Sequence, residues 1–458
     1  MSAQMQHVSL ARELADWCRR LTVADDVAER SQMLLADFLA CMLGGLDEPV
    51  SRSTLRALGP DRSAQSIAWI MGTSGHALEL DDTHEESSLH AGTVIWPTVL
   101  ALAPGCGASC DDALRAAVVG YDVASFLGTL AGAQATYEHG FHPTGVYGAV
   151  GAAAAAGCLL NLDEEALVSA MGIACSLAGG TLAFLADGSW TKPMHAGAAA
   201  AHGIRAARLA ESGFRGPASA LDGAAGLAWA FAGRRIARDS IALPAFGDGM
   251  RDTGIKLYPC CRYIHGLLDL LRPDVVGVLD PATIDRITCT VLSGGFLLVA
   301  SPAADKVEVS NQVAAQFSAP FGAALMLTRH SATLREYRDA SVLGPALRPL
   351  MERVQCVTSD ELDRAYPAKW GAAVSITLRD GSHIERSTPF MRGSPHAPLD
   401  WDGLQQKMAD LIGASRAADV MRNARSFNGS QAAGDQPAVS MAYDATLARS
   451  FISVSCET

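Results

Sequence analysis

The amino-acid sequence predicts a mainly α-helical protein of 458 residues, with a large all-α domain and a smaller α+β domain. Helical patterns are expected through about the first 245 residues, and no segment of residues 144–242 alternates apolar and polar residues. Segments of period two that are rich in β-branched residues begin only after Asp269. More than half of the chain is therefore expected to be helical before any strand appears.

The N-terminal half contains a series of predicted helices. Leu10, Leu14, Trp17 and Leu21 lie three or four positions apart, which predicts an amphipathic helix, and a second such series follows up to residue 45. Alanine, glycine and leucine dominate residues 144–242, which permits close approach between helices. Residues 49–65 are predicted to form a helix followed by a loop. Further helices in this half are predicted at Thr93–Ala103 and Asp111–Ala131.

The strands are predicted in the last 190 residues. Residues 283–292 alternate with period two, and residues 372–386 form two such runs around the turn Asp380-Gly381. Helices are predicted at Ala314–Leu327, Trp401–Ala418 and Gln436–Leu447. The last two are expected to return to the first domain. The all-α domain is thus predicted from residues 1–268 and 400–458, and the α+β domain from residues 269–399.

Composition narrows the classes of function. A formal charge of −12 argues against nucleic acid as a partner but is compatible with a small anionic substrate held in a local cationic pocket. The N-terminus lacks the basic start and apolar run of a signal peptide, and the longest apolar stretches are rich in alanine and glycine, as in buried helices. The eleven cysteines have no paired zinc-ligand spacing. A cytoplasmic protein with reduced thiols and no membrane partner is predicted.

The charge-dense segment of residues 75–90 is the first candidate for chemistry. Seven titratable groups lie within a dozen positions between two apolar segments, which indicates either acid–base chemistry or a capped junction between helices. These groups are Glu79, Asp81, Asp82, His84, Glu85, Glu86 and His90.

Four other segments place polar residues at breaks between apolar helices, where an internal pocket would open. Each residue also has an ordinary structural interpretation: a lone histidine is more often a core or surface residue, and adjacent cysteines are more often buried apolar groups than nucleophiles. The sequence has no nucleophile elbow, Walker loop, dinucleotide fingerprint or His-Glu-x-x-His helix. The four segments are Tyr137–Gly145 with His139 and His142, Asp187–His195 with Lys192 and His195, Ile255–His265 with Lys256, Tyr258, Arg262, Tyr263 and His265, and Gln316–Phe321.

These segments together resemble the MmgE/PrpD family, which includes 2-methylcitrate dehydratase, cis-aconitate decarboxylase and iminodisuccinate epimerase. The resemblance rests on four strings in order along nearly the whole chain. It implies an all-α domain closed by a smaller α+β lid, a homodimer, and no metal or organic cofactor. The strings are His76-Ala-Leu-Glu-Leu-Asp-Asp-Thr-His84, Gly140-Phe-His-Pro-Thr144, Asp187-Gly-Ser-Trp-Thr-Lys-Pro-Met-His-Ala-Gly197 and Lys256-Leu-Tyr-Pro-Cys-Cys-Arg-Tyr-Ile-His265.

The resemblance also implies site residues. Catalytic roles fall on His142, His90, Lys192, Lys256 and Asp82, and substrate contacts on Glu79, Thr83, Arg262, Tyr258, His195, Cys261 and Phe321. Members often have Asp in place of Glu79, and Pro where Ala91 follows His90. Phe321 replaces a usual Tyr, and Cys261 replaces a His of the cis-aconitate decarboxylases. The last two replacements remove polar groups from the implied pocket, which disfavours decarboxylation of cis-aconitate.

The predicted activity is that of a cofactor-independent lyase that removes a proton next to a carboxylate of a small polycarboxylate, most simply a 2-methylcitrate-like dehydratase. Alternatives are an epimerase, a decarboxylase or a catalytically lapsed binding protein. Lys192, Lys256 and Arg262 would hold carboxylates. His142 is predicted to be the base, because its segment is otherwise uncharged, and His90 the acid, because Glu85 and Glu86 are near it in sequence.

Overall fold

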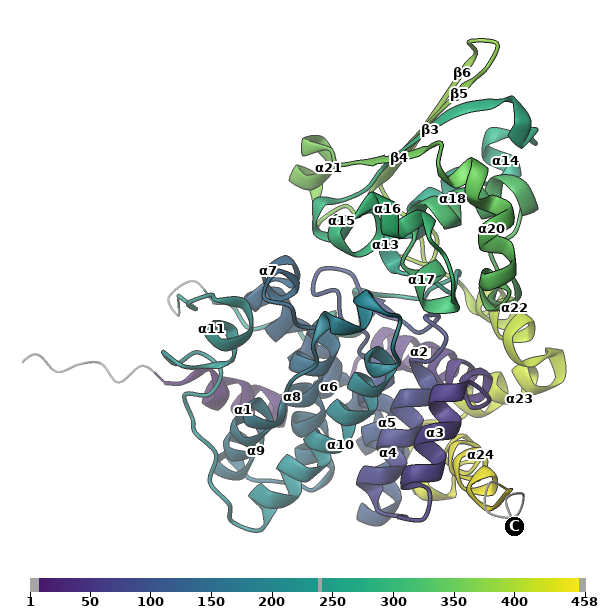
Figure 1. Cartoon of the computed structure of the whole chain (residues 1–458). Helices are drawn as coiled ribbons and strands as arrows, with labels where there is room; N and C mark the ends of the chain where they lie inside the picture. Colours follow the sequence, from purple (N-terminus) through teal and green to yellow (C-terminus); the bar gives the residue numbers. More distant parts are fainter. Residues whose placement is uncertain (1–7, 238–240, 453–458) are drawn as a thin grey trace, which may run out of the picture.

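The computed structural model describes residues 8–237 and 241–452 (Figure 1). Residues 1–7 lie outside the described residues. They make up most of the N-terminal segment that, from its sequence, is not expected to be a signal peptide. Two large hydrophobic cores organise the rest. The helical body is built around the first core, and the sheet-bearing body, drawn above it in Figure 1, is built around the second. The protein is mainly helical, as the sequence predicts.

The N-terminal helices form most of the helical body, and the predicted helices of the first 245 residues are present. Their order is α1 (Leu10–Arg20), α2 (Asp25–Gly45), α3 (Pro49–Leu58), α4 (Ala64–Gly75), α5 (Gly92–Cys106), α6 (Cys110–Ala131), α7 (Ala133–Glu138), α8 (Pro143–Leu159), α9 (Glu164–Leu177), the 3₁₀ helix η1 (Leu182–Ala186), α10 (Thr191–Glu211), α11 (Leu227–Ala232) and α12 (Asp248–Arg251).

Small residues bring three of these helices into close contact. A Cβ added at Gly72 of α4 would lie 2.8 Å from the Cα of Gly197 in α10, and one added at Gly203 of α10 would lie 2.3 Å from the Cβ of Ala152 in α8. Such approach leaves no room for a larger side chain at either glycine. The packing fixes the end of α4 and the starts of α8 and α10 relative to one another, and these three helix ends carry His76, His142 and Lys192.

The helices after the sheet pack on the helical body. Leu404, Met408, Val420 and Phe427 are buried in its core. The predicted run Trp401–Ala418 is wrong as one helix, because Gly413 adopts a positive φ of 84° that ends the first helix. The elements are α22 (Trp401–Ile412), α23 (Ala414–Arg425), the 3₁₀ helix η4 (Ala433–Asp435) and α24 (Pro437–Ile452).

The sheet-bearing body holds a four-stranded sheet in the order β4-β3-β5-β6. Strand β3 pairs in parallel with β4 and antiparallel with β5, and β5 pairs antiparallel with β6. The elements are α13 (Arg262–Leu270), α14 (Pro273–Val276), the 3₁₀ helix η3 (Pro281–Thr283), β3 (Ile284–Thr290), α15 (Ser293–Val299), α16 (Ala303–Val307), α17 (Gln312–Gln316), α18 (Ala319–Arg329), α19 (Leu334–Arg338), α20 (Ala340–Met351), β4 (Val354–Val357), α21 (Asp360–Ala365), β5 (Ala372–Leu378) and β6 (His383–Thr388).

The three predicted strands correspond to β3, β5 and β6, and the turn between the last two contains Gly381 at a positive φ of 86°. The predicted helix Ala314–Leu327 is two helices, α17 and α18. It breaks because the Ser318 side chain accepts a hydrogen bond from the backbone N–H of Phe321, capping α18, and Pro320 stands in its first turn. The second core already includes Tyr258, upstream of the predicted domain boundary at residue 269.

A two-residue strand interrupts the first, helical half of the chain. Strand β1 (Thr83–His84) pairs antiparallel with β2 (Thr253–Gly254), with Thr83 opposite Gly254. The sequence did not predict this pairing, because two residues are too few to show a period and the partner lies about 170 positions away. The pairing holds the charge-dense segment against the segment that carries Lys256.

Helix α6 is long and apolar enough to cross a membrane by length and composition alone. However, 78% of its apolar window is buried inside the protein, where it packs against α8. Such burial is typical of a core helix.

Candidate active site

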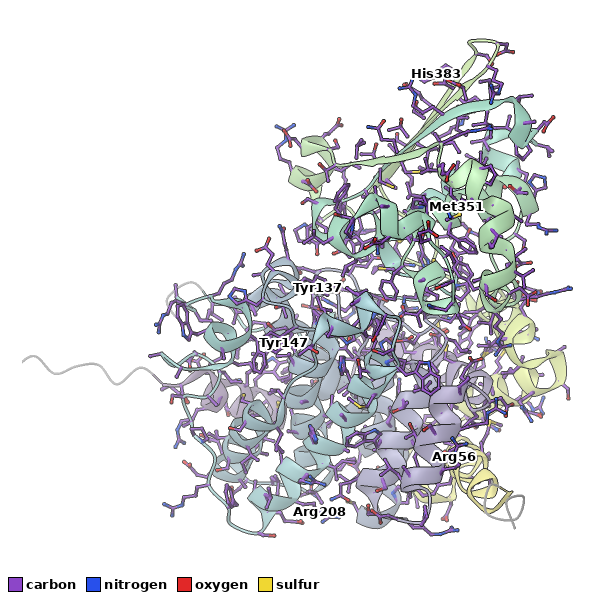
Figure 2. All side chains as sticks on the ribbon, in the orientation of Figure 1. Arg56, Tyr137, Tyr147, Arg208, Met351 and His383 are labelled. Atoms are coloured by element: carbon purple, nitrogen blue, oxygen red, sulfur yellow. The ribbon has the colours of Figure 1, made fainter. Side chains whose placement is uncertain are left out.

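A small cavity lies where the predicted segments meet, between the helical body and the sheet-bearing body. Tyr137, one of its lining residues, is labelled in Figure 2 at the level where the two bodies meet. The free space at its centre is about 20 Å³, enough for about one water molecule. The cavity is lined by Glu79, Thr83, Ser88, His90, Tyr137, His142, Leu182, Phe184, Lys192, Cys261, Arg262, Tyr263, Leu298 and Phe317.

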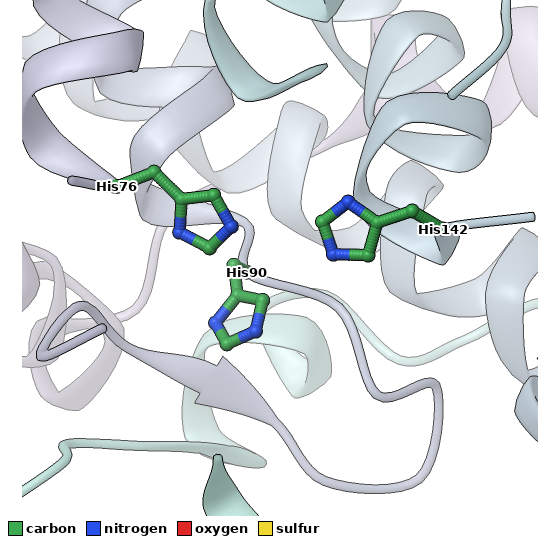
Figure 3. A group of neighbouring side chains, drawn as sticks. All are labelled: His76, His90 and His142. Carbon is green, nitrogen blue, oxygen red and sulfur yellow. The ribbon is translucent and has the colours of Figure 1, made fainter. Parts of the chain in front are cut away.

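Three buried histidines gather from three segments, as Figure 3 shows. His76 follows α4, His90 follows β1, and His142 precedes α8. Candidate ligand nitrogens of the three rings lie within 4.8 Å of one another, and the rings of His76 and His142 are nearly parallel with centroids 5.7 Å apart. His76 was not predicted as a site residue, although it begins the first motif string. Its sequence signal is weak, because a single histidine at a helix end is common.

Asp81 orients two of the three rings. One of its oxygens, Oδ2, lies 2.8 Å from Nδ1 of His76 and 3.2 Å from Nδ1 of His90. Nδ1 of His90 also lies 2.8 Å from the carbonyl oxygen of Asp82, so this nitrogen carries the proton and donates it. Nε2 of His90 is then left for a ligand. Burial alone would raise the pKa of Asp81, but the neighbouring His76 and His90 lower it well below its usual value.

Burial keeps His142 in the neutral form. It lowers the pKa of His142 well below the usual value for histidine, and the neighbouring His195 acts in the same direction. Nδ1 of His142 lies 3.3 Å from Nδ1 of His195, whose own pKa burial lowers to about 4. The backbone N–H of His142 donates to the carbonyl oxygen of Gly180, which fixes the start of α8. A neutral, fixed imidazole is what a general base requires.

The two predicted lysines are brought together and share one carboxylate. Both oxygens of Glu79 are used, since Oε1 accepts from Nζ of Lys192 and Oε2 accepts from Nζ of Lys256 at 2.9 Å. Nζ of Lys192 also lies 2.9 Å from Nε2 of His76. Burial and the charge of Lys256 lower the pKa of Lys192 well below its usual value, and burial lowers that of Lys256.

The predicted third cation, Arg262, is also paired. Its Nη2 donates to Oε1 of Glu85 at 2.7 Å. Glu85 is therefore engaged with Arg262 rather than with His90, and Glu86 has no ion pair with His90 among the described residues. The sequence predicted that Glu85 and Glu86 act on His90 and favour its role as the acid. This prediction is wrong, because the carboxylate that contacts the ring of His90 is Asp81.

Asp82 faces away from the cavity, although the resemblance implies a catalytic role for it. Its Oδ2 accepts from the hydroxyl of Tyr121 at 2.6 Å and its Oδ1 from the backbone N–H of Gly92 at 2.9 Å. Burial raises the pKa of Asp82 to about 7. Consecutive residues of an extended segment point in opposite directions, so only one of the two aspartates can serve the histidines. Asp82 instead holds the start of α5.

Two predicted substrate contacts also lie outside the cavity. The hydroxyl of Tyr258 donates to Oδ1 of Asp269 at 2.8 Å, and the ring of Phe321 packs on Tyr337 inside the second core. Phe317, four residues earlier than Phe321, lines the cavity instead, with its ring centroid 5.6 Å from Nζ of Lys192. Sequence analysis did not single out Phe317, because an aromatic residue in a core segment has no distinctive signal.

The other predicted residues do reach the cavity or its immediate surroundings. Thr83 and Cys261 line it, and His195 contacts His142 behind it. The apolar lining residues Leu182, Phe184 and Leu298 were not predicted.

The three histidines are the described residues best arranged to hold a metal ion, and two of them are backed by a carboxylate, as metal-binding histidines often are. The ammonium group of Lys192 stands 2.9 Å from Nε2 of His76, however, where it would repel a cation. The donor set is therefore better suited to acid–base chemistry than to a resident metal.

Comparison with known proteins agrees with the resemblance. The model of the MmgE/PrpD N-terminal domain matches residues 12–238, and that of the MmgE/PrpD C-terminal domain matches residues 258–426. A cis-aconitate decarboxylase-like protein, oryM, of Aspergillus oryzae is 28% identical over 92% of this chain and 93% of its own length. The cis-aconitate decarboxylase of Aspergillus terreus is 25% identical over 88% of this chain and 89% of its own, and that of Homo sapiens is 28% identical over 74% of this chain and 71% of its own.

Proposed function

The chain belongs to the MmgE/PrpD family, and from this premise we propose that it is a lyase that needs no cofactor and acts on a small polycarboxylate. The observation that supports the proposal most strongly is the small cavity lined by neutral, buried His142 and by buried Lys192, which Glu79 joins to buried Lys256. Relatives that are similar over most of this chain are named cis-aconitate decarboxylases, which also act on a small carboxylate.

Proton removal is the proposed first step. A C–H next to a carboxylate is a weak acid, because removing its proton builds negative charge on a group that is already anionic. His142 would take the proton as general base, and Lys192 and Lys256 would stabilise the charge that develops on the carboxylate oxygens. Burial strengthens these interactions, because little water is present to screen them.

Elimination of water is the proposed second step. The electron pair left by the proton forms the new C=C bond, while the C–O bond to the hydroxyl group breaks. A protonated His90 would give its Nε2 proton to that hydroxyl, which leaves as water. Asp81 and the carbonyl oxygen of Asp82 support this role, because both hold Nδ1 and leave Nε2 for the leaving group.

Decarboxylation is the second candidate, and the relatives' names favour it. In that reaction the C–C bond to a carboxylate breaks, CO₂ leaves, and a proton from an acid such as His90 replaces it. Cys261 lines the cavity where the sequence resemblance implies a histidine in the decarboxylases, so one polar group of that reaction is missing. Epimerisation, which needs only proton removal and return, uses the same residues.

We also propose that the sheet-bearing body acts as a lid. The cavity holds about one water molecule, so a substrate can enter only if its walls separate. The family resemblance predicts a homodimer, which light scattering coupled to size-exclusion chromatography tests, and the scattered cysteines predict a cytoplasmic location.

The activity is tested by incubating the pure protein with candidate di- and tricarboxylates in deuterated water. A dehydratase yields an unsaturated product with loss of water, and a decarboxylase releases CO₂. An epimerase replaces one hydrogen of the substrate with deuterium and changes the mass of the substrate in no other way. Absence of product and of deuterium with every candidate would contradict the proposal and favour a binding protein.

A further inference from the structure

A group of hydroxyls lines the cavity in addition to the histidines and the cations. Ser88 and Tyr137 come from the N-terminal half of the chain, and Tyr263 comes from α13 of the sheet-bearing body. The hydroxyl oxygens of Ser88 and Tyr137 lie 2.8 Å apart and share a hydrogen bond, and the hydroxyl of Ser88 also interacts with that of Tyr263. Three segments that are distant in the sequence thus bring hydroxyls to one cavity, and none of the three has a role in the proposed steps.

The backbone and the packing hold these hydroxyls in place. Ser88 has a positive φ of 53°, which a residue other than glycine adopts only when its surroundings hold it there. The ring of Tyr263 packs edge-on against Trp370, with centroids 4.7 Å apart, and a Cβ added at Gly295 would lie 2.1 Å from Cγ of Tyr263. The tyrosine ring therefore lies directly on that glycine. A ligand that binds these hydroxyls has little side-chain freedom to remove, which favours affinity.

The chemistry of the hydroxyls selects the group that they can bind. Burial raises the pKa of Tyr137 and of Tyr263 above the usual value for tyrosine, so both keep their protons at neutral pH. Besides burial, the side chains that act on these two pKa values are other hydroxyls and the thiol of Cys261. These surroundings are uncharged.

A hydroxyl donates one hydrogen bond and also accepts, and the Ser88–Tyr137 pair already uses one proton internally. A carboxylate only accepts, so it would face lone pairs that it cannot bind. A ligand hydroxyl can both donate to such a pair and accept from it, and it brings no charge that needs a cation. The matching ligand group is therefore a hydroxyl.

We propose that Ser88, Tyr137 and Tyr263 bind a hydroxyl group of the substrate and determine specificity for it. This inference rests on the proposed function for the carboxylates and the reacting C–H, and it adds that the substrate is a hydroxylated polycarboxylate. An analogue that lacks the hydroxyl leaves buried polar groups without a partner, and a site built to hydrogen-bond a hydroxyl rejects such an analogue.

The test compares ligands that differ by one hydroxyl. Citrate and tricarballylate share three carboxylates, malate and succinate share two, and in each pair a hydroxyl of the first ligand replaces a hydrogen atom of the second. We expect the wild-type protein to bind the hydroxylated member of at least one pair at least about tenfold more tightly, by calorimetry at pH 8, where all carboxylates are ionised.

Two variants assign this preference to the tyrosines. Tyr137→Phe and Tyr263→Phe each remove one hydroxyl and keep the ring, so each should reduce the preference with little change in affinity for the ligand that lacks the hydroxyl. A purely structural role would instead weaken the binding of both members of a pair alike. Tyr147→Phe is the matched control and should retain the preference, because the hydroxyl of Tyr147 bonds that of Thr136 and does not line the cavity.

The wild-type ratios decide the matter even if a variant fails to fold. Absence of a preference for the hydroxylated member in both pairs, or an unchanged preference in folded Tyr137→Phe and Tyr263→Phe, would overturn the inference. The proposed function is judged separately by deuterium exchange. Exchange into carboxylates without any preference for a hydroxyl would support the function and contradict this inference. Preferential binding of the hydroxylated ligand without exchange into any carboxylate would do the reverse.

Discussion

At the scale of single residues, one carboxylate organises the acid–base groups. Asp81 accepts from Nδ1 of His76 and lies 3.2 Å from Nδ1 of His90, which donates to the carbonyl oxygen of Asp82. These contacts select, for each ring, the tautomer that leaves Nε2 unprotonated in the neutral state. Nε2 of His76 then accepts a hydrogen bond from Nζ of Lys192, while Nε2 of His90 is left for a ligand. The two rings share a partner but have different tasks, since one positions a lysine and the other can exchange a proton with substrate.

His142→Asn should abolish solvent deuterium exchange into the substrate, because it removes the neutral imidazole proposed as the base. His90→Asn should slow elimination on the order of 10²–10⁴-fold but leave measurable exchange, because it removes only the proton donor. Mass spectrometry of recovered substrate measures both effects. His139→Asn is the matched control, since His139 is exposed and its ring hydrogen-bonds the carbonyl oxygen of Ala135 in its own helix. Exchange at the wild-type rate in His142→Asn would transfer the base role to another group.

Lys192→Ala should raise KM and lower kcat, the latter on the order of 10²–10³-fold, because its charge is needed more in the transition state than in the ground state. Steady-state kinetics give the two parameters separately. Lys369→Ala serves as the control, because Lys369 is exposed and distant in sequence from every lining segment. Unchanged kinetics in Lys192→Ala would remove this lysine from the site.

At the scale of elements, the C-terminal helix α22 supports the active-site segment from behind. Nζ of Lys407 in α22 donates to Oδ1 of Asp37 in α2 and, at 2.7 Å, to the carbonyl oxygen of Leu80. Leu80 stands between Glu79 and Asp81. A helix about 320 residues later in the chain therefore holds the backbone between the two carboxylates that engage the lysines and the histidines.

Lys407→Met should destabilise the protein by about 3–5 kcal/mol, because it leaves the buried carboxylate of Asp37 without its cation. Equilibrium denaturation in urea measures the change. The double variant Lys407→Met/Asp37→Leu should recover much of the loss, since it removes both buried charges. Equal stabilities of the single and double variants would show that the pair is not what holds α22 in place.

At the scale of the whole molecule, the buried titratable groups make stability depend on pH. Burial lowers the pKa of six histidines, and those of His84 and His195 fall to about 4; the other four are His76, His142, His202 and His265. In the unfolded chain these histidines bind protons below about pH 6.5. Burial raises the pKa of Asp82 and Asp122 to about 7, so these two carboxyls act in the opposite direction.

Stability should therefore fall as the pH decreases from about 6.5 toward 4. The unfolded state gains protons on six histidines in this range. The folded state holds extra protons on fewer groups, namely Asp82 and Asp122, with a pKa of about 7, and the carboxyls of Asp37, Glu86 and Asp252, whose pKa burial also raises. Each proton of difference changes the free energy of unfolding by about 1.4 kcal/mol per pH unit. Urea denaturation at pH 7, 6, 5 and 4 measures the slope. His84→Asn should flatten it, and a free energy of unfolding that rises toward pH 5 would contradict the expectation.

Exhaustive treatment with a chelator should leave activity unchanged, because Lys192 stands at the nitrogen of His76 that a cation would need. Activity before and after dialysis against EDTA tests this. Activity that is lost and then restored by a divalent ion would assign the three histidines to a metal.

Local patterns in the sequence determined the helical class of this protein, the strands β3, β5 and β6, and the segments that carry Lys192, Lys256, His90 and His142. Each of these is a property of neighbouring residues: a period of apolar positions, a turn such as Asp380-Gly381, or a motif string. The sequence predicted that helices after the strands return to the first domain, but it did not predict that α22 pairs with α2.

The tertiary structure alone decided which residues of those segments face the cavity. Asp81 and Asp82 are adjacent and chemically alike, and only the packing of Asp82 against Tyr121 turns Asp81 toward the histidines. Phe317 lines the cavity while Phe321 is buried in the second core, because a break between α17 and α18 separates them. Side-chain direction and charge pairing depend on partners that are distant in sequence, such as Glu79 with Lys256, and no local pattern encodes them.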